Sequence, residues 1–311
     1  MKALVTGGAG FIGSNLVDRL IEENYEVFII DNLSTGFEKN INKSAFFYNN
    51  DIRDENAIIE IFQNEKFDYV FHFAAQIDVR LSITEPLKDS SINILGTLNL
   101  LESSIKAGVR KFIYSNTGGA LYGEVPFEDI PISENYRIIP ECHYGVSKYT
   151  VELFLNLYNR LYGLNFTSLR FPNVYGDRQN PQGEAGVVAI FIGKLLKNIR
   201  PIIYGDGNQT RDYIYVKDVV NGAIKSIHKG NNQCINLGSG IETSVNDLMK
   251  TIKEISNINI DPIYEEKRKG EIERIALDAS KALLELDWKP EYSLKDGIYN
   301  TYNYFKDHLN K

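Results

Sequence analysis

Few residues in this sequence can form disulfides or hold a metal ion. The 311 residues include two cysteines, Cys142 and Cys234, which lie far apart in the chain. This number and spacing are typical of free thiols in a reducing compartment, so we expect a cytoplasmic protein. The four histidines have no spacing that would ligate a metal, and we therefore predict no metal site.

Long apolar runs and long basic runs are also missing. No apolar stretch reaches about 18 residues, the length that a transmembrane helix needs. The first segment, MKALVTGGAG, turns into glycines after too few apolar residues for a signal peptide. The formal net charge is −7. Because no long basic run is present we expect no nucleic acid as a partner, and because no long apolar stretch is present we expect no membrane.

The sequence does contain a regular alternation of strand-like and helix-like segments. Several short segments are almost continuously apolar, which indicates strands buried on both faces of a parallel sheet. These segments are 2–6, 25–30, 45–49, 69–74 and 111–115, and helical periodicity lies between them at 11–22, 54–65 and 88–107. Strands that alternate with helices predict an α/β fold with a doubly wound parallel sheet of the Rossmann type.

The character of the sequence changes after residue 171. A long helix is predicted at 143–162 and a strand at 166–171, and a loop rich in Gly, Pro and Asn follows at 172–186. Residues 233–240 again have the pattern of a buried strand, which we expect to rejoin the first sheet. We therefore predict a cofactor-binding domain and a smaller, discontinuous α/β region that binds substrate. The domain covers 1–171, rejoined by about 218–240, and the second region covers 172–217 and 241–311.

The tetrapeptide TGGA occurs twice, and its first copy, at 6–9, begins a dinucleotide-binding fingerprint. A strand-like segment runs into TGGAGFIG, and an amphipathic segment follows. Gly7, Gly10 and Gly13 permit a tight turn, close approach of a pyrophosphate to the backbone, and packing of the helix on the strand. The start of the helix adds partial positive charge for the phosphates.

Asp31 lies at the end of the second strand-like segment. A carboxylate at this place accepts hydrogen bonds from the adenosine ribose and repels a 2′-phosphate. The segment that it begins, DNLSTGFEKN, contains no arginine. We therefore predict NAD rather than NADP as the cofactor.

The second copy of TGGA, at 117–120, follows the fifth strand-like segment, and no helical period comes after it. Without a helix start it is a poor cradle for pyrophosphate. Ligands of open α/β sheets lie beyond the carboxyl ends of the strands, so the hydroxyls of Ser115 and Thr117 are predicted to face a ligand. Taken alone, Thr117 is equally well explained as a turn-forming residue.

The predicted helix at 143–162 carries a tyrosine and a lysine four residues apart, Tyr144 and Lys148. This spacing places both side chains on one side of the helix. A free phenol has a pKa of about 10, too high for a base near neutrality. A nearby ammonium and a positively charged nicotinamide both favour the phenolate. The pair is therefore a candidate catalytic base and its partner.

With these motifs the sequence resembles the extended short-chain dehydrogenase/reductase family and, within it, the UDP-glucose (UDP-galactose) 4-epimerases. The resemblance covers essentially the whole chain. It rests on TGGAGFIGS (6–14), DNLSTG (31–36), DIRD (51–54), HFAAQIDVRLSITEP (72–86), NILGTLNLLE (93–102), SNTGGALYGE (115–124), YGVSK (144–148), LRFPNVYGDRQNP (169–181) and YGDGNQTRDYIYVKDV (204–219).

The resemblance implies roles for individual residues, with Tyr144 as the base, Lys148 as its partner and Thr117 as the hydroxyl that binds the sugar O4. The positions that match NAD contacts are Gly7, Gly10, Phe11, Ile12, Gly13, Asp31, Asn32, Asp51, Ile52, Ala74, Ala75, Asn93, Ser115, Tyr144 and Lys148. The positions that match UDP-sugar contacts are Thr117, Tyr144, Asn173, Val187, Ile202, Tyr204, Arg211, Arg268 and Ile275. The arginines suit a diphosphate, because guanidinium groups pair well with phosphate oxygens.

The implied reaction is NAD-dependent 4-epimerisation of a UDP-hexose through a transient 4-keto intermediate. The base removes the O4 proton, a hydride passes from C4 to NAD, and the sugar turns before the hydride returns to the other face. Related dehydratases carry Asp-Glu directly after the threonine, and related decarboxylases carry a nearby Glu. This chain has Gly118 and Gly119 there, which favours simple oxidation and re-reduction.

Several alternatives remain at this stage. Ile275 matches a position that limits bulk at the sugar C2, so UDP-GlcNAc and UDP-GalNAc are expected substrates beside UDP-glucose and UDP-galactose. A UDP-glucuronate 4-epimerase is the first alternative, because Thr117 and Arg80 could meet a carboxylate. A nucleotide-sugar dehydratase or decarboxylase is another. The non-enzyme alternative is an NAD-binding sensor or scaffold, which would not need a base such as Tyr144.

The predicted helices at 88–107 and 143–162 carry apolar residues beyond one face. Similar helices pair between subunits in the family that the sequence resembles. We therefore expect a homodimer.

Overall fold

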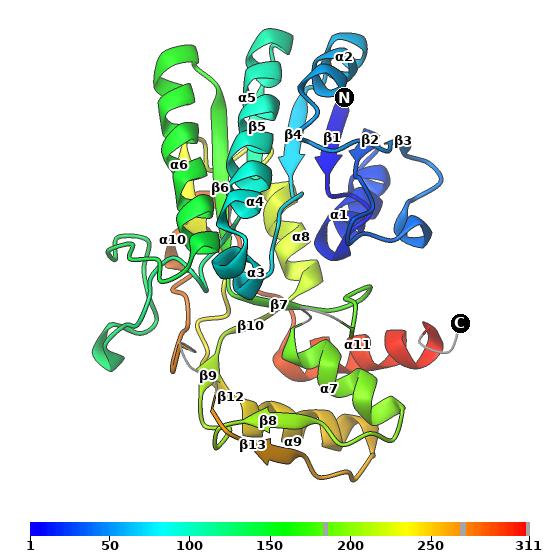
Figure 1. Cartoon of the computed structure of the whole chain (residues 1–311), viewed down its shortest axis with the longest axis vertical. Helices are drawn as coiled ribbons and strands as arrows, with labels where there is room; N and C mark the ends of the chain where they lie inside the picture. Colours follow the sequence, from blue (N-terminus) through cyan, green and yellow to red (C-terminus); the bar gives the residue numbers. More distant parts are fainter. Residues whose placement is uncertain (183–185, 268–271, 309–311) are drawn as a thin grey trace.

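A parallel sheet lies at the centre of the molecule (Figure 1). The computed structural model describes residues 1–182, 186–267 and 272–308. The strand order in the sheet is β11-β6-β5-β4-β1-β2-β3, and every neighbouring pair is parallel. The strands are β1 (Lys2–Thr6), β2 (Glu26–Ile30), β3 (Phe46–Tyr48), β4 (Tyr69–His72), β5 (Lys111–Thr117), β6 (Asn165–Phe171) and β11 (Gln233–Asn236). The predicted doubly wound α/β fold is confirmed.

Helices cover both faces of this sheet, which explains why its strands are continuously apolar. In β1, Ala3 and Val5 belong to one buried cluster and Leu4 belongs to another, and all three are fully buried. The first cluster includes α1 (Phe11–Glu22) and α8 (Val216–Lys225), and the second includes α2 (Glu55–Glu65), α5 (Gly96–Ala107) and α6 (His143–Tyr162). Among the described residues, no helix is both long and apolar enough to span a membrane.

The helix predicted at 143–162 has the same limits in the structure. α6 begins after Cys142, whose Sγ accepts a hydrogen bond from the backbone N of Gly145 at 3.4 Å. It ends at Gly163, which has a φ of +72° and so suits the left-handed turn that closes a helix. These limits place Tyr144 and Lys148 in the first two turns.

The single helix predicted at 88–107 is wrong in one respect. The segment consists of α4 (Pro86–Ser90), a π-helical turn (Ser91–Leu95) and α5. Within the wide turn, the Asn93 side chain bonds to Gln76 and Asp89. A π turn adds a residue to one helical turn and is common near functional sites, but apolar periodicity does not reveal it.

The second region lies beyond the carboxyl ends of the sheet strands (Figure 1). The loop expected at 172–186 contains a short strand, β7, which pairs in parallel with β10. The other elements include a parallel pair β8 and β13 and an antiparallel pair β9 and β12. The bounds are β7 (Asn173–Tyr175), α7 (Val187–Leu196), β8 (Ile202–Tyr204), β9 (Thr210–Arg211), β10 (Tyr213–Tyr215), β12 (Thr243–Ser244), α9 (Val245–Ser256), β13 (Ile263–Glu265) and α11 (Leu294–His308).

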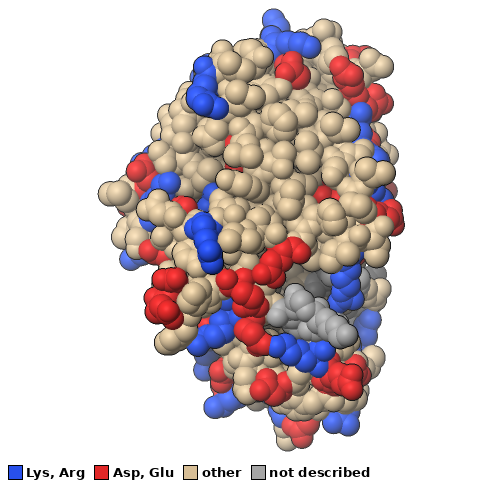
Figure 2. Space-filling view, turned by 60° about the vertical axis from the view of Figure 1, so that its left-hand side comes forward, with Lys and Arg blue, Asp and Glu red and all other residues tan. Residues whose placement is uncertain are grey.

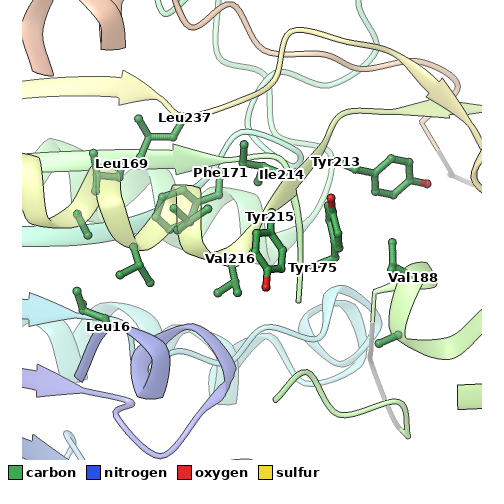
Figure 3. Packing of buried hydrophobic residues seen from close by; sticks show 14 of the residues in the cluster. Leu16, Leu169, Phe171, Tyr175, Val188, Tyr213, Ile214, Tyr215, Val216 and Leu237 are labelled. Carbon is green, nitrogen blue, oxygen red and sulfur yellow. The ribbon is translucent and has the colours of Figure 1, made fainter. Parts of the chain in front are cut away.

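One continuous apolar core joins the sheet to this second region. Figure 3 shows Leu169 and Phe171 of β6 leading to Tyr175 and Tyr215, with Val188 of α7 beyond them. All five are buried. The second region is therefore packed onto the sheet edge that carries the candidate site.

Candidate active site

The glycine loop at the start of α1 has the geometry that a dinucleotide cradle needs. Gly7 has a φ of +73°, and a Cβ atom added there would lie 2.7 Å from the backbone N of Ala74. A Cβ atom at Gly13 would lie 2.2 Å from the carbonyl oxygen of Gly7. Gly10 precedes α1, so the amides of Phe11, Ile12 and Gly13 lie at the helix start. Such a helix start favours phosphate groups.

A cavity of about 1030 Å³ extends from this loop along the carboxyl ends of the central strands. Its walls include most of the residues predicted to contact the cofactor. They are Gly7, Gly10, Phe11, Ile12, Gly13, Asp31, Asn32, Asp51, Ile52, Ala74, Ala75, Ser115, Tyr144 and Lys148, together with Thr117. A volume of this size is in the range of cofactor sites.

Asp31 both lines the cavity and braces the glycine loop. Its Oδ2 accepts the backbone N of Ala9 at 3.0 Å, and its Oδ1 accepts the backbone N of Leu33 at 2.8 Å. Burial raises the pKa of the Asp31 carboxyl, and these two backbone bonds oppose that effect. The carboxylate is thus fixed against the glycine loop in the cavity wall.

Asp51 forms a polar cluster at the same end of the cavity. It accepts hydrogen bonds from Asn32 Nδ2 at 2.8 Å and from Arg53 Nε and Nη2 at 2.9 and 2.7 Å. The hydrogen bonds from Arg53 lower the pKa of Asp51 to about 2. The sequence argument missed Arg53, which lines the cavity but is held on Asp51 and comes from outside the segment 31–40.

Thr117, Tyr144 and Lys148 all line this cavity. Thr117 ends β5, and its side chain lies close enough to the Tyr144 phenol to lower the pKa of that phenol. The Lys148 Nζ donates to the carbonyl oxygen of Ser115 at 2.6 Å and lies 4.4 Å from the centre of the Tyr114 ring. Tyr144 and Lys148, four positions apart on α6, thus both lie against the end of β5 that carries Thr117.

The electrostatic surroundings oppose charge on both members of this pair. Burial raises the pKa of Tyr144 well above its usual value, Cys142 and Asp89 raise it further, and the hydrogen bond from Thr117 opposes them. Burial lowers the pKa of Lys148 to about 7, against the influence of Asp89 and Glu152. A positively charged nicotinamide in the cavity would shift the tyrosine toward phenolate.

Asn93 has a different position from the one expected. It does not line the cavity among the described residues. Its Oδ1 accepts the backbone N of Gln76 at 2.8 Å, and its Nδ2 donates to the Gln76 carbonyl at 3.0 Å. Gln76 does line the cavity. Asn93 therefore supports the wall through Gln76.

The residues predicted to hold the UDP-sugar are spread over several elements of the second region. Asn173 begins β7, and its backbone N donates to Asp212 at 3.0 Å, next to Arg211. Val187 begins α7, and Ile202 and Tyr204 lie in β8. In the described part of the chain, none of these five residues lines the cavity of about 1030 Å³. Arg268 lies outside the described residues.

Ile275 lies in a small buried cluster behind the second TGGA segment. It is 1% exposed and packs with Leu121, Tyr122, Ile132 and Leu277. The sequence-based gate residue is thus covered by apolar neighbours in this structure. The backbone next to Ile275 is also held in place, because the backbone N of Ile132 donates to the carbonyl oxygen of Ala276 at 2.8 Å.

The two glycines after Thr117 differ in their surroundings. A Cβ atom at Gly118 would lie 2.3 Å from Leu277 Cδ1, so that position has no room for a side chain. A Cβ atom at Gly119 would meet only Thr117 Oγ1, at 3.8 Å. Neither glycine supplies an acid or base, and a side chain at position 118 would require Leu277 to move.

Other parts of the cavity wall come from residues to which the sequence assigned no role. Pro172 lies between β6 and β7, and the loop after β7 contributes Arg178 and Gln179. Arg178 Nη2 donates to Asp18 Oδ2 of α1 at 2.5 Å, which links the second region to the first. No local sequence signal marks this contact. Arg80, considered for a carboxylate substrate, is exposed on α3 (Val79–Thr84) and is not part of the cavity wall among the described residues.

Comparison with known proteins defines the class. A family model described as the NAD dependent epimerase/dehydratase family matches residues 3–238, and the chain therefore belongs to that family. This result confirms the predicted cofactor, NAD, and agrees with the glycine loop and Asp31.

Particular relatives extend over the whole chain. A protein of Methanocaldococcus jannaschii, provisionally named UDP-glucose 4-epimerase, is 50% identical over 304 residues, which are 98% of each chain. The solved UDP-glucose 4-epimerase of Thermotoga maritima with UDP-glucose is 48% identical, with a TM-score of 0.97, and the match covers 99% of this chain and 100% of that one. The Thermus thermophilus UDP-glucose 4-epimerase in complex with NAD is 37% identical, with a TM-score of 0.93 and the same coverage.

Proposed function

We propose that this protein is an NAD-dependent UDP-hexose 4-epimerase that interconverts UDP-glucose and UDP-galactose. The observation that carries this proposal is that Thr117, Tyr144 and Lys148 line one cavity together with the glycine loop. No acid or base follows the threonine, since positions 118 and 119 are glycines. The relatives named UDP-glucose 4-epimerase support the same substrate class.

In this mechanism Tyr144 removes the proton from the sugar O4, and Thr117 binds the same oxygen. NAD, held by the glycine loop and Asp31, would supply the acceptor for the C4 hydride and the donor for its return. Lys148 is held by the Ser115 carbonyl, and in its ammonium form it would favour the ionised form of the Tyr144 phenol. The sugar turns as a 4-keto intermediate between the two hydride transfers.

The diphosphate should be held by Asn173 and Arg211, with Arg268 as a further ligand, while Val187, Ile202 and Tyr204 surround the uridine. Backbone contacts already bring Asn173 next to Asp212. Firm binding of UDP and loose binding of the hexose would let both faces of the sugar reach the nicotinamide. Acceptance of N-acetylhexosamines stays a prediction from the resemblance, because Ile275 is buried among apolar neighbours and does not line the cavity.

The experiment is incubation of the purified protein with UDP-glucose, UDP-GlcNAc and UDP-glucuronate separately, without added NAD, followed by separation of the 4-epimers. We expect conversion of the first two and none of the third, because Arg80 is exposed on α3 and does not line the cavity. Tyr144→Phe should lose turnover by about 10³-fold, in the range of a removed acid/base group, and still retain NAD. Undiminished turnover in that variant would contradict the mechanism, and conversion of UDP-glucuronate alone would overturn the substrate assignment.

We also propose a homodimer formed through α5 and α6. Val146, Leu153, Leu161 and Tyr162 of α6 are each at least half exposed, as is Leu95 beside α5. Figure 2 looks at the side of the molecule where α6 lies, and its upper half shows a wide area with few charged side chains. Exposed apolar areas of this kind mark interaction surfaces. Sedimentation equilibrium should give twice the mass of one chain, and Leu153→Asp should reduce it; a monomer at all concentrations would contradict this proposal.

A further inference from the structure

Two buried carboxylates influence Lys148, and they differ in their partners. Glu152 lies on α6, one turn after Lys148, and is 2% exposed. Asp89 lies on α4 and is fully buried. Both favour the charged form of the lysine. Only a carboxylate without a cationic partner presents a net negative charge to the lysine.

Glu152 is neutralised by a cation of its own. Arg170 donates to Glu152 from Nε at 2.9 Å and from Nη2 at 2.7 Å, with both side chains almost fully buried. Asn116 Nδ2 adds a bond at 2.7 Å. A bidentate pair of this kind presents a dipole rather than a net charge to its surroundings.

Asp89 has no such partner in the part of the chain that the structure describes. Its Oδ1 accepts bonds from two neutral amides, Gln76 Nε2 at 2.9 Å and Asn93 Nδ2 at 3.1 Å. Its Oδ2 is buried and accepts no hydrogen bond from the described residues. A buried carboxylate without a cation is costly, so its retention calls for a reason.

Hydrogen bonds join Asp89 to the helix that carries the candidate base. The Nδ2 of Asn93, which bonds to Asp89, also lies 3.2 Å from Ser147 Oγ, and Ser147 directly precedes Lys148. α4 packs against α6. The carboxylate is therefore fixed relative to both Tyr144 and Lys148.

The other titratable groups around this pair are neutral near pH 7. Burial lowers the pKa of His72 on β4 well below its usual range, and burial raises the pKa of Tyr114 on β5. Burial also raises the pKa of the Cys142 thiol, which precedes α6. Glu152 is paired with Arg170. Among the described groups that act on Lys148 and Tyr144, Asp89 is therefore the carboxylate that has no cationic partner.

We propose that Asp89 is a positioning residue, whose buried and unpaired carboxylate keeps Lys148 as an ammonium and sets the pH range in which Tyr144 and Lys148 work together. This inference rests on the proposed roles of those two residues. Asp89 itself touches neither substrate nor cofactor in this account. It favours the charged form of Lys148, and it opposes ionisation of the Tyr144 phenol.

The direct test is Asp89→Asn. The amide can retain the oxygen that accepts from Gln76 and Asn93, so the substitution mainly removes the charge. Without that charge the ammonium loses its proton at lower pH, and the phenol also ionises at lower pH. Both limbs of the kcat profile should therefore move by about one unit toward acid, the effect of one nearby charge. A uniform loss of kcat with unmoved limbs would overturn the proposal.

Ser147→Ala is the matched control, because it removes the contact with Asn93 and changes no charge. Its limbs should stay in place, and a shift equal to that of Asp89→Asn would overturn the electrostatic reading. If Asp89→Asn does not fold, Asp89→Ser removes the same charge and leaves a hydroxyl that can accept from Gln76.

A second readout does not depend on epimerase activity. The ultraviolet absorbance of phenolate is titrated in the NAD-loaded protein, with Tyr144→Phe as the reference that isolates the Tyr144 signal. Asp89→Asn should form this phenolate at lower pH than the wild type, and an identical titration would overturn the proposal. Absence of epimerisation in the wild type would instead refute the proposed function and leave this spectroscopic comparison valid.

Discussion

The two TGGA segments have the same four residues and different surroundings. In the first, Gly7 adopts a positive φ and α1 begins directly afterwards, so the backbone is the functional part. In the second, no helix directly follows, the Thr117 side chain lowers the pKa of the Tyr144 phenol, and Gly118 packs against Leu277. The element that follows a motif, rather than its letters, therefore decides which atoms of the motif face the ligand.

Among the substitutions that distinguish the two TGGA segments, a change of Thr117 should have the largest effect. Thr117→Val keeps the shape of the side chain and removes the hydroxyl next to Tyr144. We expect turnover of UDP-glucose to fall by about 100-fold, with unchanged NAD content, because the hydroxyl assists proton transfer and does not hold the cofactor. Steady-state kinetics and the absorbance of bound NAD measure the two effects. Loss of NAD in this variant would show that the two segments share one role.

The opposite pattern is expected at the first segment. Gly13→Ala places a methyl group 2.2 Å from the Gly7 carbonyl, so the loop must move away from its cradle shape. An overpacking cost of about 1–3 kcal/mol predicts a loss of NAD affinity of roughly tenfold or more. Isothermal titration with NAD checks this, and Thr117→Val serves as the control. Normal NAD binding by Gly13→Ala would contradict the assigned backbone role.

The smallest expected effect distinguishes the two glycines of the second segment. Gly118→Ala meets Leu277 at 2.3 Å, whereas Gly119→Ala meets only Thr117 Oγ1 at 3.8 Å. Gly118→Ala should lower the free energy of unfolding by about 1–3 kcal/mol, and Gly119→Ala should change it by less than about 0.5 kcal/mol. Urea unfolding compares them. Equal values for the two variants would remove the packing argument for position 118.

The first region was predictable because its signals are local. Continuous apolarity marked the strands, glycine spacing marked the cradle, and the four-residue spacing of Tyr144 and Lys148 marked one helix face. In the folded chain the neighbouring parallel strands bring these segments together, and the segments line one cavity.

Features that depend on distant contacts were less accessible to sequence reasoning. The π turn interrupts an otherwise helical period, and Asn93 faces Gln76 because of that turn. The contact between Arg178 and Asp18 joins segments 160 positions apart. The described residues among the proposed UDP ligands lie in four elements, β7, α7, β8 and β9, so no local pattern specifies how they meet.

We propose that the hydride that leaves C4 is carried by one bound NAD and is then returned to C4 of the same sugar. The most direct measurement uses UDP-glucose labelled with deuterium at C4, without added NAD, and mass analysis of the UDP-galactose formed. Our account predicts that the product keeps its label at C4, because the hydride never exchanges with water. Formation of unlabelled UDP-galactose, or of none at all, would contradict it.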